Sequence, residues 1–217
     1  MTRCYASVDQ LPRTLPVFPL AGVLLLPRGR LPLNVFEKRY LAMLDDALAG
    51  DRVIGMIQPS DPTAGEPAPA LYPVGCAGRI TQFAESEDGR YLVTLSGVAR
   101  FKVAEELPLL KGYRRVVPDW TQYTGDLKSE GCSVDRSRLV ALLQDYFRKN
   151  GLSANWEAVE NAPDERLLTS LAMICPFAAC EKQALLEAGC LADRAQIMMT
   201  LLEIAIADGC EDGRPRH

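Results

Sequence analysis

The spacing of apolar residues divides the chain into a strand-rich first half and a helical second half. Short apolar runs bounded by turn residues predict strands at Val53–Ile57 and at Tyr113–Trp120. The dipeptide Asp88-Gly89 lies between two alternating segments and predicts a hairpin, because these residues tolerate the positive φ angles of a tight turn. Among these strands, apolar residues recurring every three or four positions predict one helix from Val35 to Ala49.

Beyond residue 133 the apolar spacing is helical throughout. The clearest helical stripe consists of Leu139, Leu142, Leu143, Tyr146 and Phe147. Three further segments, within 163–176, 181–187 and 191–205, have the same period, and four helices with short joins predict a small bundle. Residues 121–133 are polar and include two glycines, so we expect a linker there and two domains, residues 1–122 and 123–217.

Prolines interrupt the apolar segment that precedes the first helix. Pro16, Pro19, Pro27 and Pro32 predict short edge strands and tight bends, because proline has no N–H to donate to a central ladder. Asn34 followed by Glu37 predicts a capping box at the start of the helix. Residues 1–14 read as a loose leader. The proline-rich stretch 58–73 reads as a surface loop, and 208–217 as a frayed tail.

Five segments, in order along the chain, resemble one known domain. The run from Leu15 to Leu48 resembles the opening of the N-terminal substrate-binding domain of the Lon protease family. The similarity continues through the segments Asp51–Ile57, Val74–Ile80, Asp88–Tyr91 with Leu95–Phe101, and Glu181–Glu187. The resemblance implies an α+β fold in which a PUA-like β pseudo-barrel is followed by a small α-helical bundle.

Catalytic motifs are missing from the sequence. It holds no G-x-x-x-x-G-K-[ST] loop for a triphosphate and no stretch resembling the serine-lysine peptidase site of the Lon family. The only histidine is the last residue, His217, so no internal Ser-His or Cys-His pair can form. We therefore expect no enzymatic activity and no cofactor, and we interpret the chain as the substrate-binding domain standing as a separate protein.

Charge and cysteine content limit the ligands and the cellular compartment that we expect for this chain. The net charge is -4, and neither half has the basic excess typical of proteins that bind phosphate backbones. Seven cysteines without metal-ligand spacing predict free thiols, no metal site and a reducing cytoplasm. No signal peptide is visible, and no apolar run approaches the roughly 20 residues of a membrane span.

The leading hypothesis is a non-catalytic module that binds unfolded or extended polypeptide, with or without an ATP-dependent protease as partner. The alternative is an RNA-binding PUA-like protein, and an unrecognised enzyme is a third possibility. An RNA-binding face would have to use the basic residues of the strands, which are Arg79, Arg100, Lys102, Arg114 and Arg115. The near-neutral charge of the first half makes nucleic acid the weaker prediction.

We expect the substrate-binding residues where the proline-broken segment meets the first helix. These candidates are Leu31, Pro32, Phe36, Arg39 and Tyr40. For Phe36 and Tyr40 we favour packing in the core of an amphipathic helix over a binding role, and for Arg39 we favour a surface ion pair or a structural contact. On the last helix, Met198 falls on the apolar stripe and is expected in the core, whereas Met199 falls off it and could form an adaptable apolar surface.

Overall fold

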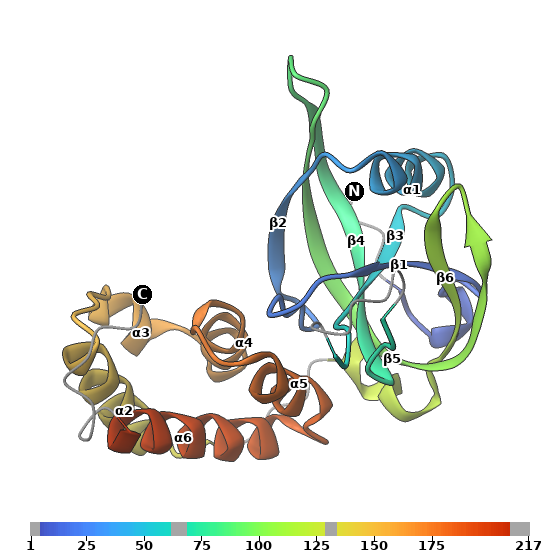
Figure 1. The fold of residues 1–217 in the computed structure, drawn as a ribbon. Helices are drawn as coiled ribbons and strands as arrows, with labels where there is room; N and C mark the ends of the chain where they lie inside the picture. Colours follow the sequence, from blue (N-terminus) through green and yellow to red (C-terminus); the bar gives the residue numbers. More distant parts are fainter. Residues whose placement is uncertain (1–4, 62–68, 129–133, 209–217) are drawn as a thin grey trace. The chain divides into compact units, whose positions relative to one another are not determined.

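The computed structural model describes residues 5–61, 69–128 and 134–208. Contacts within the chain divide it into two compact units, Met1–Glu130 and Gly131–His217. Figure 1 draws both units, and each is described by itself below. None of the described helices is long and apolar enough to cross a membrane.

The first unit contains the strands. They are β1 (Leu15–Pro19), β2 (Arg30–Val35), β3 (Val53–Ile57), β4 (Val74–Glu85), β5 (Tyr91–Leu110) and β6 (Tyr113–Asp119). Its helical segments are η1 (Val8–Gln10), α1 (Lys38–Ala49) and η2 (Thr121–Leu127). The predicted strand at Val53–Ile57 is confirmed, and so is the hairpin at Asp88-Gly89, where Gly89 has a φ of 77°.

The six strands form one sheet that closes on itself. Their order is β2-β5-β4-β3-β1-β6, and β6 pairs back with β5. At 20 residues, β5 is long enough to pair with β2 and β4 along its first part and with β6 along its second. The α+β prediction is confirmed, although β2 stays outside the closed ring and the sheet is not a regular barrel. The PUA-like description stays a prediction.

The expectation of edge strands is correct for β2 and wrong for β1. Within the described residues β2 pairs only with β5, whereas β1 lies between β3 and β6. Proline is tolerated in β1 because the two neighbouring strands, β3 and β6, pair with different parts of β1. Leu15–Val17 pairs with β6 and Val17–Pro19 pairs with β3, so Pro16 and Pro19 each have a partner on one side only.

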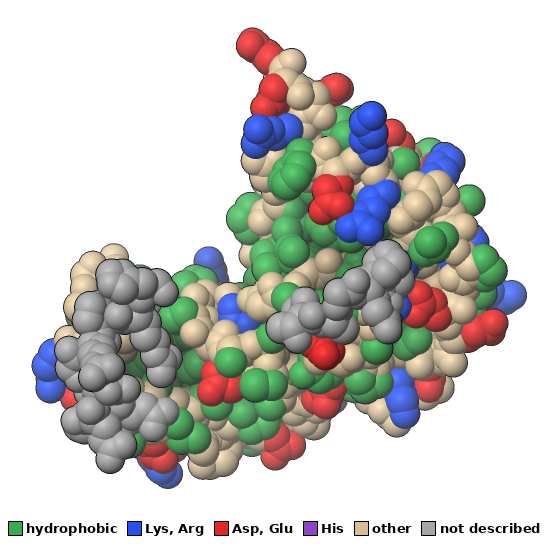
Figure 2. Space-filling view, viewed as in Figure 1, with side chains coloured by type: hydrophobic (Ala, Val, Ile, Leu, Met, Phe, Trp, Pro, Cys, Tyr) green, Lys and Arg blue, Asp and Glu red, His purple; other side chains and the backbone are tan. Residues whose placement is uncertain are grey.

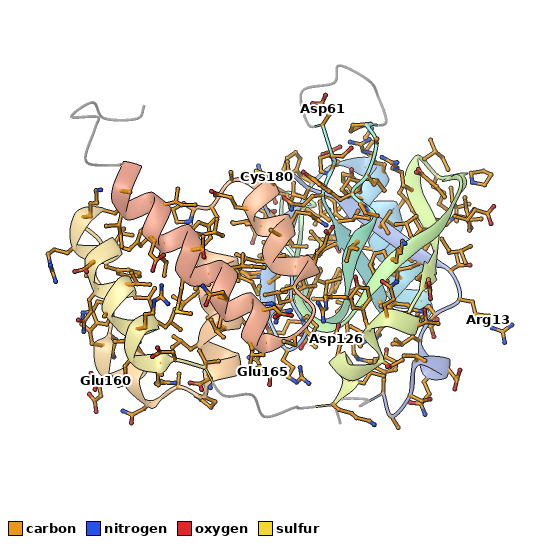
Figure 3. All side chains as sticks on the ribbon, turned by 90° about the horizontal axis from the view of Figure 1, so that it is seen from below. Arg13, Asp61, Asp126, Glu160, Glu165 and Cys180 are labelled. Atoms are coloured by element: carbon orange, nitrogen blue, oxygen red, sulfur yellow. The ribbon has the colours of Figure 1, made fainter. Side chains whose placement is uncertain are left out.

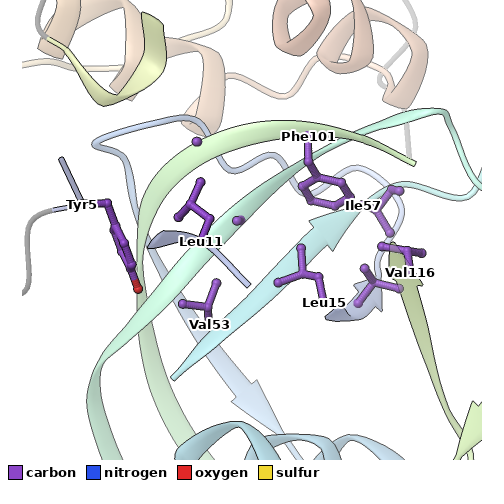
Figure 4. Packing of buried hydrophobic residues seen from close by; sticks show 10 residues of the cluster. Tyr5, Leu11, Leu15, Val53, Ile57, Phe101 and Val116 are labelled. Carbon is purple, nitrogen blue, oxygen red and sulfur yellow. The ribbon is translucent and has the colours of Figure 1, made fainter. Parts of the chain in front are cut away.

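One hydrophobic cluster fills the closed part of the sheet (Figure 4). Leu15, Phe101 and Val116 are fully buried there, and the Phe101 ring lies 5.8 Å from that of Trp120. Tyr5 and Leu11 are also buried in this cluster. From Tyr5 onward the expected loose leader is therefore wrong, because the segment covers one face of the sheet; residues 1–4 lie outside the described residues.

The opposite face of the sheet is covered by α1 and by the segment that joins β1 to β2. Leu24, Leu25 and Leu26 are buried, and a Cβ added to Gly97 would lie 1.9 Å from the Leu26 carbonyl oxygen. Glycine at position 97 therefore lets two backbones approach closely.

The predicted helix is confirmed over α1, with Tyr40, Met43, Leu44 and Ala47 buried, but it begins only after Glu37. Glu37 makes no side-chain cap bond and Asn34 belongs to β2, so the capping-box prediction is wrong.

Most of the expected linker packs against the first unit. In η2, Tyr123 is buried and the Asp126 carboxylate accepts hydrogen bonds from the backbone N–H and the Nε of Arg100, both at 2.9 Å. Contacts accordingly divide the chain after residue 130, later than the expected boundary between residues 122 and 123. Residues 129–133 lie outside the described part of the chain, as do 62–68 of the expected loop and 209–217 of the expected tail.

The second unit is helical. Its helices are α2 (Arg136–Lys149), α3 (Trp156–Asn161), α4 (Asp164–Ile174), α5 (Ala179–Glu187) and α6 (Leu191–Asp208). The helix α6 contacts α2, α4 and α5. The short α3, capped by the Asn155 side chain, was not predicted. Met198 and Met199 are both buried, so the expectation that Met199 forms an exposed apolar surface is wrong, because helices pack on more than one side of α6.

Candidate functional site

An open groove lies where β2, β5 and β4 run side by side, outside the closed ring. Its volume is about 490 Å³, and it is lined by Pro32, Leu33, Asn34, Gln82, Phe83, Ala84, Leu92, Val93 and Thr94. The β4–β5 hairpin projects from the rest of the first unit at this end of the sheet (Figure 1). On the face seen in Figure 2, charged side chains occupy the tip of the hairpin and apolar ones lie below them.

Strand register shows which side chains share the exposed face of the groove. Pro32 lies opposite Thr94, which lies opposite Gln82. Asn34, Leu92 and Ala84 form the next row in the same way. Because directly opposite residues point to the same face, these two rows lie on one side of the sheet, and the row between them points to the other.

This exposed face mixes apolar and neutral polar groups. Leu92 is 47% exposed, and Pro32 and Ala84 are also exposed. The Thr94 hydroxyl donates to the Gln82 amide oxygen at 2.8 Å, so these two polar groups are hydrogen-bonded to each other. Such a surface has no fixed charge on its floor and suits side chains of many kinds.

The sequence-predicted site residues separate into exposed and buried ones. Pro32 lines the groove, and Phe36, 64% exposed, follows directly after β2 with the Arg90 guanidinium 5.9 Å from its ring. The core alternative for Phe36 is therefore wrong. Tyr40 is buried, with its ring 4.2 Å from that of Phe18, and burial raises its pKa.

The other two candidates, Leu31 and Arg39, direct their side chains partly toward other residues of the fold. Leu31 is half-buried and pairs with the buried Leu95, so its side chain points away from the exposed face. Arg39 forms an ion pair with Glu37 at 2.8 Å, and its guanidinium also lies 4.6 Å from the Tyr40 ring. Of the five candidates, Pro32 therefore lines the groove and Phe36 is exposed just beyond the end of β2, whereas Tyr40 is buried and Leu31 is half-buried.

Two exposed apolar residues at this end of the sheet were missed from the sequence. Leu92 alternates with Tyr91 and Val93 along β5, so it shares a face with the polar Thr94. Phe83, 44% exposed, stacks edge-on against Tyr91 at 4.9 Å on the other face. An apolar residue on the polar face of a predicted strand was the available signal.

A hydrogen-bonded network holds α1 beside the groove. The Tyr91 hydroxyl donates to Asp45 at 3.0 Å, while Lys111 and the Tyr113 hydroxyl donate to Asp46 at 2.6 and 2.9 Å. These two donors lower the pKa of Asp46, and burial together with Asp46 raises the pKa of Tyr113 to about 12. The adjacent aspartates therefore face different hairpins and act as anchors for the helix.

Arg79, Arg100 and Arg114, three of the five basic residues of the strands, make contacts within the fold. Arg100 forms a buried ion pair with Asp126 at 2.8 Å, and Arg114 pairs with Glu106 at 2.6 Å. Arg79 donates to the Tyr5 hydroxyl at 3.3 Å. Figure 3 shows the side chains, with Asp126 labelled at η2 and Arg13 extending into solvent.

The described residues contain no group of three or more potential metal ligands. Of their cysteines, Cys76 and Cys175 are buried, and Cys180 and Cys190 are exposed. Burial raises the pKa of the Cys175 thiol to about 11, which keeps it protonated and unreactive at neutral pH.

Comparisons with known proteins place the chain in a family. A family model described as the ATP-dependent protease La (LON) substrate-binding domain matches residues 14–203. The chain belongs to this family. It is similar to Lon protease 2 of Myxococcus xanthus (29% identical, covering 89% of this chain and 24% of the relative) and to Lon protease 2 of Thermus thermophilus (28% identical, covering 91% and 25%). The chain thus spans about a quarter of the length of these relatives.

Solved structures show the same fold. One is a Lon N-terminal domain protein from Xanthomonas campestris, with a TM-score of 0.58, 22% identity, and coverage of 88% of this chain and 97% of that one. Another is the N-terminal domain of the Mycobacterium avium complex Lon protease, with a TM-score of 0.62, 15% identity, and coverage of 90% and 98%. The resemblance recognised from the sequence is confirmed over both units.

Proposed function

We propose that this protein is a non-catalytic module that binds unfolded or extended polypeptide. The observation that carries the proposal is the match to the substrate-binding domain of Lon over residues 14–203. The groove beside β2 supports it, because exposed apolar side chains with neutral polar neighbours can contact a chain without demanding a particular sequence. Lon relatives suggest polypeptide substrates and an ATP-dependent protease as partners.

We further propose that the chain itself turns over no substrate and works in the cytoplasm. The lack of a triphosphate-binding loop motif and of any internal histidine supports the first statement. The free cysteines among the described residues support the second, because disulfides are rare in reducing compartments. Incubation with ATP and magnesium should produce neither turnover nor a thermal shift; a saturable shift would contradict the proposal.

A holding assay tests the polypeptide-binding proposal directly. A chemically denatured, reduced client protein is diluted into buffer with and without the chain, and its aggregation is followed by light scattering. The wild-type chain should slow aggregation in proportion to its concentration and should not bind the folded client. Equal affinity for folded and unfolded client would overturn the proposal.

A double variant and a control variant test whether the client protein contacts the surface around the groove. We expect Phe36→Ser combined with Leu92→Ser to weaken client binding about thirtyfold, because two exposed apolar contacts of about 1 kcal/mol each are removed. The matched control is Leu152→Ser in the second unit, since Leu152 is 46% exposed and Leu92 is 47% exposed. Equal losses in both variants would show that the groove is not the contact surface.

A further inference from the structure

The outer edge of β2 is the least protected part of the sheet. No strand pairs with that edge within the described residues, and Arg30, Pro32 and Asn34 are exposed along it. An unpaired edge presents backbone N–H and C=O groups that another extended chain can bind. Pro32 has no N–H and is best accommodated where the backbone groups of β2 point away from β5. Alternation then directs the N–H and C=O groups of Arg30 and Asn34 to the outer edge as well.

Positive charges lie at the start of β2 and three residues beyond its end. Arg30 begins β2 and Lys38 begins α1, both exposed, and neither side chain has a charged partner among the described residues. Two ion pairs lie nearby, Arg39 with Glu37 at 2.8 Å and Arg90 with Asp88 at 2.7 Å. The acidic Glu85 ends β4, which is separated from β2 by β5.

We propose that the outer edge of β2 binds an extended polypeptide segment by strand addition, and that it prefers segments whose apolar core is flanked by acidic residues. This inference rests on the proposed function and specifies the chemistry of its ligand. Backbone hydrogen bonds to Arg30 and Asn34 hold the segment. Side chains on one face of the added strand extend the two rows that begin with Pro32 and Asn34. The flanking carboxylates lie near Arg30 and Lys38.

Pro32 limits the strength of this pairing. At its position the added strand finds a carbonyl acceptor but no donor, so one carbonyl of the ligand remains without a partner from the protein. Replacing Pro32 by valine supplies that N–H on an exposed edge strand, where valine has a high β propensity. A net backbone hydrogen bond corresponds to about a fivefold gain in affinity.

Labelled peptides with one common core of alternating valine and threonine test the proposal. They carry acidic, neutral or basic flanks, and a fourth peptide has the acidic flanks and an N-methylated core that cannot donate to an edge. At low salt the acidic-flanked peptide should bind about tenfold more tightly than the basic-flanked one, and the difference should shrink as salt rises. The N-methylated peptide should not bind.

Three variants show which residues determine the peptide affinity and the preference for charged flanks. Pro32→Val should tighten binding of every unmethylated peptide about fivefold. Arg30→Glu combined with Lys38→Glu should reverse the flank preference. The matched control is Arg13→Glu, because Arg13 is exposed and lies outside β2, and it should leave the preference unchanged.

Each of the following results would contradict one part of the proposal. Strand addition is wrong if the N-methylated peptide binds as well as its parent or if Pro32→Val changes nothing. The charge preference is wrong if it survives the double reversal. If peptide binding weakens as the protein concentration rises, β2 pairs with a second copy instead. A last outcome separates this inference from the proposed function. If none of the peptides binds, but the chain still binds denatured client and Phe36→Ser with Leu92→Ser still weakens that binding, the inference is wrong and the proposed function stands.

Discussion

The two ends of β5 show how one face of one strand can be core in one place and surface in another. The register shift beside Gly78 puts Ala99 and Phe101 on the same face of the sheet as Leu92 and Thr94. Ala99 and Phe101 are fully buried, whereas Leu92 is 47% exposed.

The difference lies in what covers each end. Around Phe101 the sheet closes through β6, and residues from the N-terminal segment, β1 and η2 pack over it. Around Leu92 the described part of the sheet consists of β2, β5 and β4, and the groove lies there. Exposure at this end therefore follows from topology, and it leaves apolar surface available for a ligand.

The largest expected effect comes from replacing one apolar side chain at each end of β5. Phe101→Ala should lower the free energy of unfolding by about 3 to 5 kcal/mol, because it leaves a cavity in the closed core. Leu92→Ala should change it by less than about 0.5 kcal/mol, because the side chain is exposed. Denaturant unfolding of the two variants measures both values, and similar losses would refute the contrast.

Ion pairs at the two ends should differ in the same way. Asp126→Ala leaves the buried Arg100 without its carboxylate partner and should cost about 3 to 5 kcal/mol of unfolding free energy. Glu37→Ala removes an ion pair whose side chains are both nearly half exposed, and it should cost less than about 1 kcal/mol. If η2 were dispensable for the closed end, Asp126→Ala would resemble Glu37→Ala in chemical denaturation.

The anchor of α1 predicts a pH dependence. The pKa of Asp46 is lowered in the folded state, so ionised Asp46 contributes stability above its unfolded pKa, and this contribution is lost as pH falls below about 4. Asp46→Asn should therefore be less stable than wild type at pH 7, and the gap should narrow toward pH 3. Melting temperatures across this range measure the gap; a constant gap would show that Asp46 does not act through its charge.

The smallest expected effect concerns separation of the two units. All six strands and the groove lie within residues 1–130. We expect a fragment of these residues to melt cooperatively within about 5 °C of the corresponding transition in the full chain, and to hold denatured client with similar affinity. Limited proteolysis should cut between the units before it cuts within β5. A fragment that is unfolded would show that the units are not independent domains.

The sequence by itself determined the elements whose causes are local. Apolar periods placed α1 and α2, the Asp88-Gly89 pair placed the hairpin, and the ordered segments identified the Lon family. Prolines correctly marked β2 as an edge strand. At the candidate site, Pro32 and Phe36 came from the point where the broken strand meets the helix, which is a local feature of the chain.

Only the tertiary structure decided which apolar residues are covered. Local spacing could not show that β1 lies inside the sheet, that Tyr5 covers its face, or that Leu92 is left exposed. Each outcome depends on segments distant in sequence, since β6 and η2 close one end of β5 and no strand of the described chain extends the sheet beyond β2. Burial is a property of the assembled neighbours, so one face of the sheet along β5 is core at one end and groove at the other.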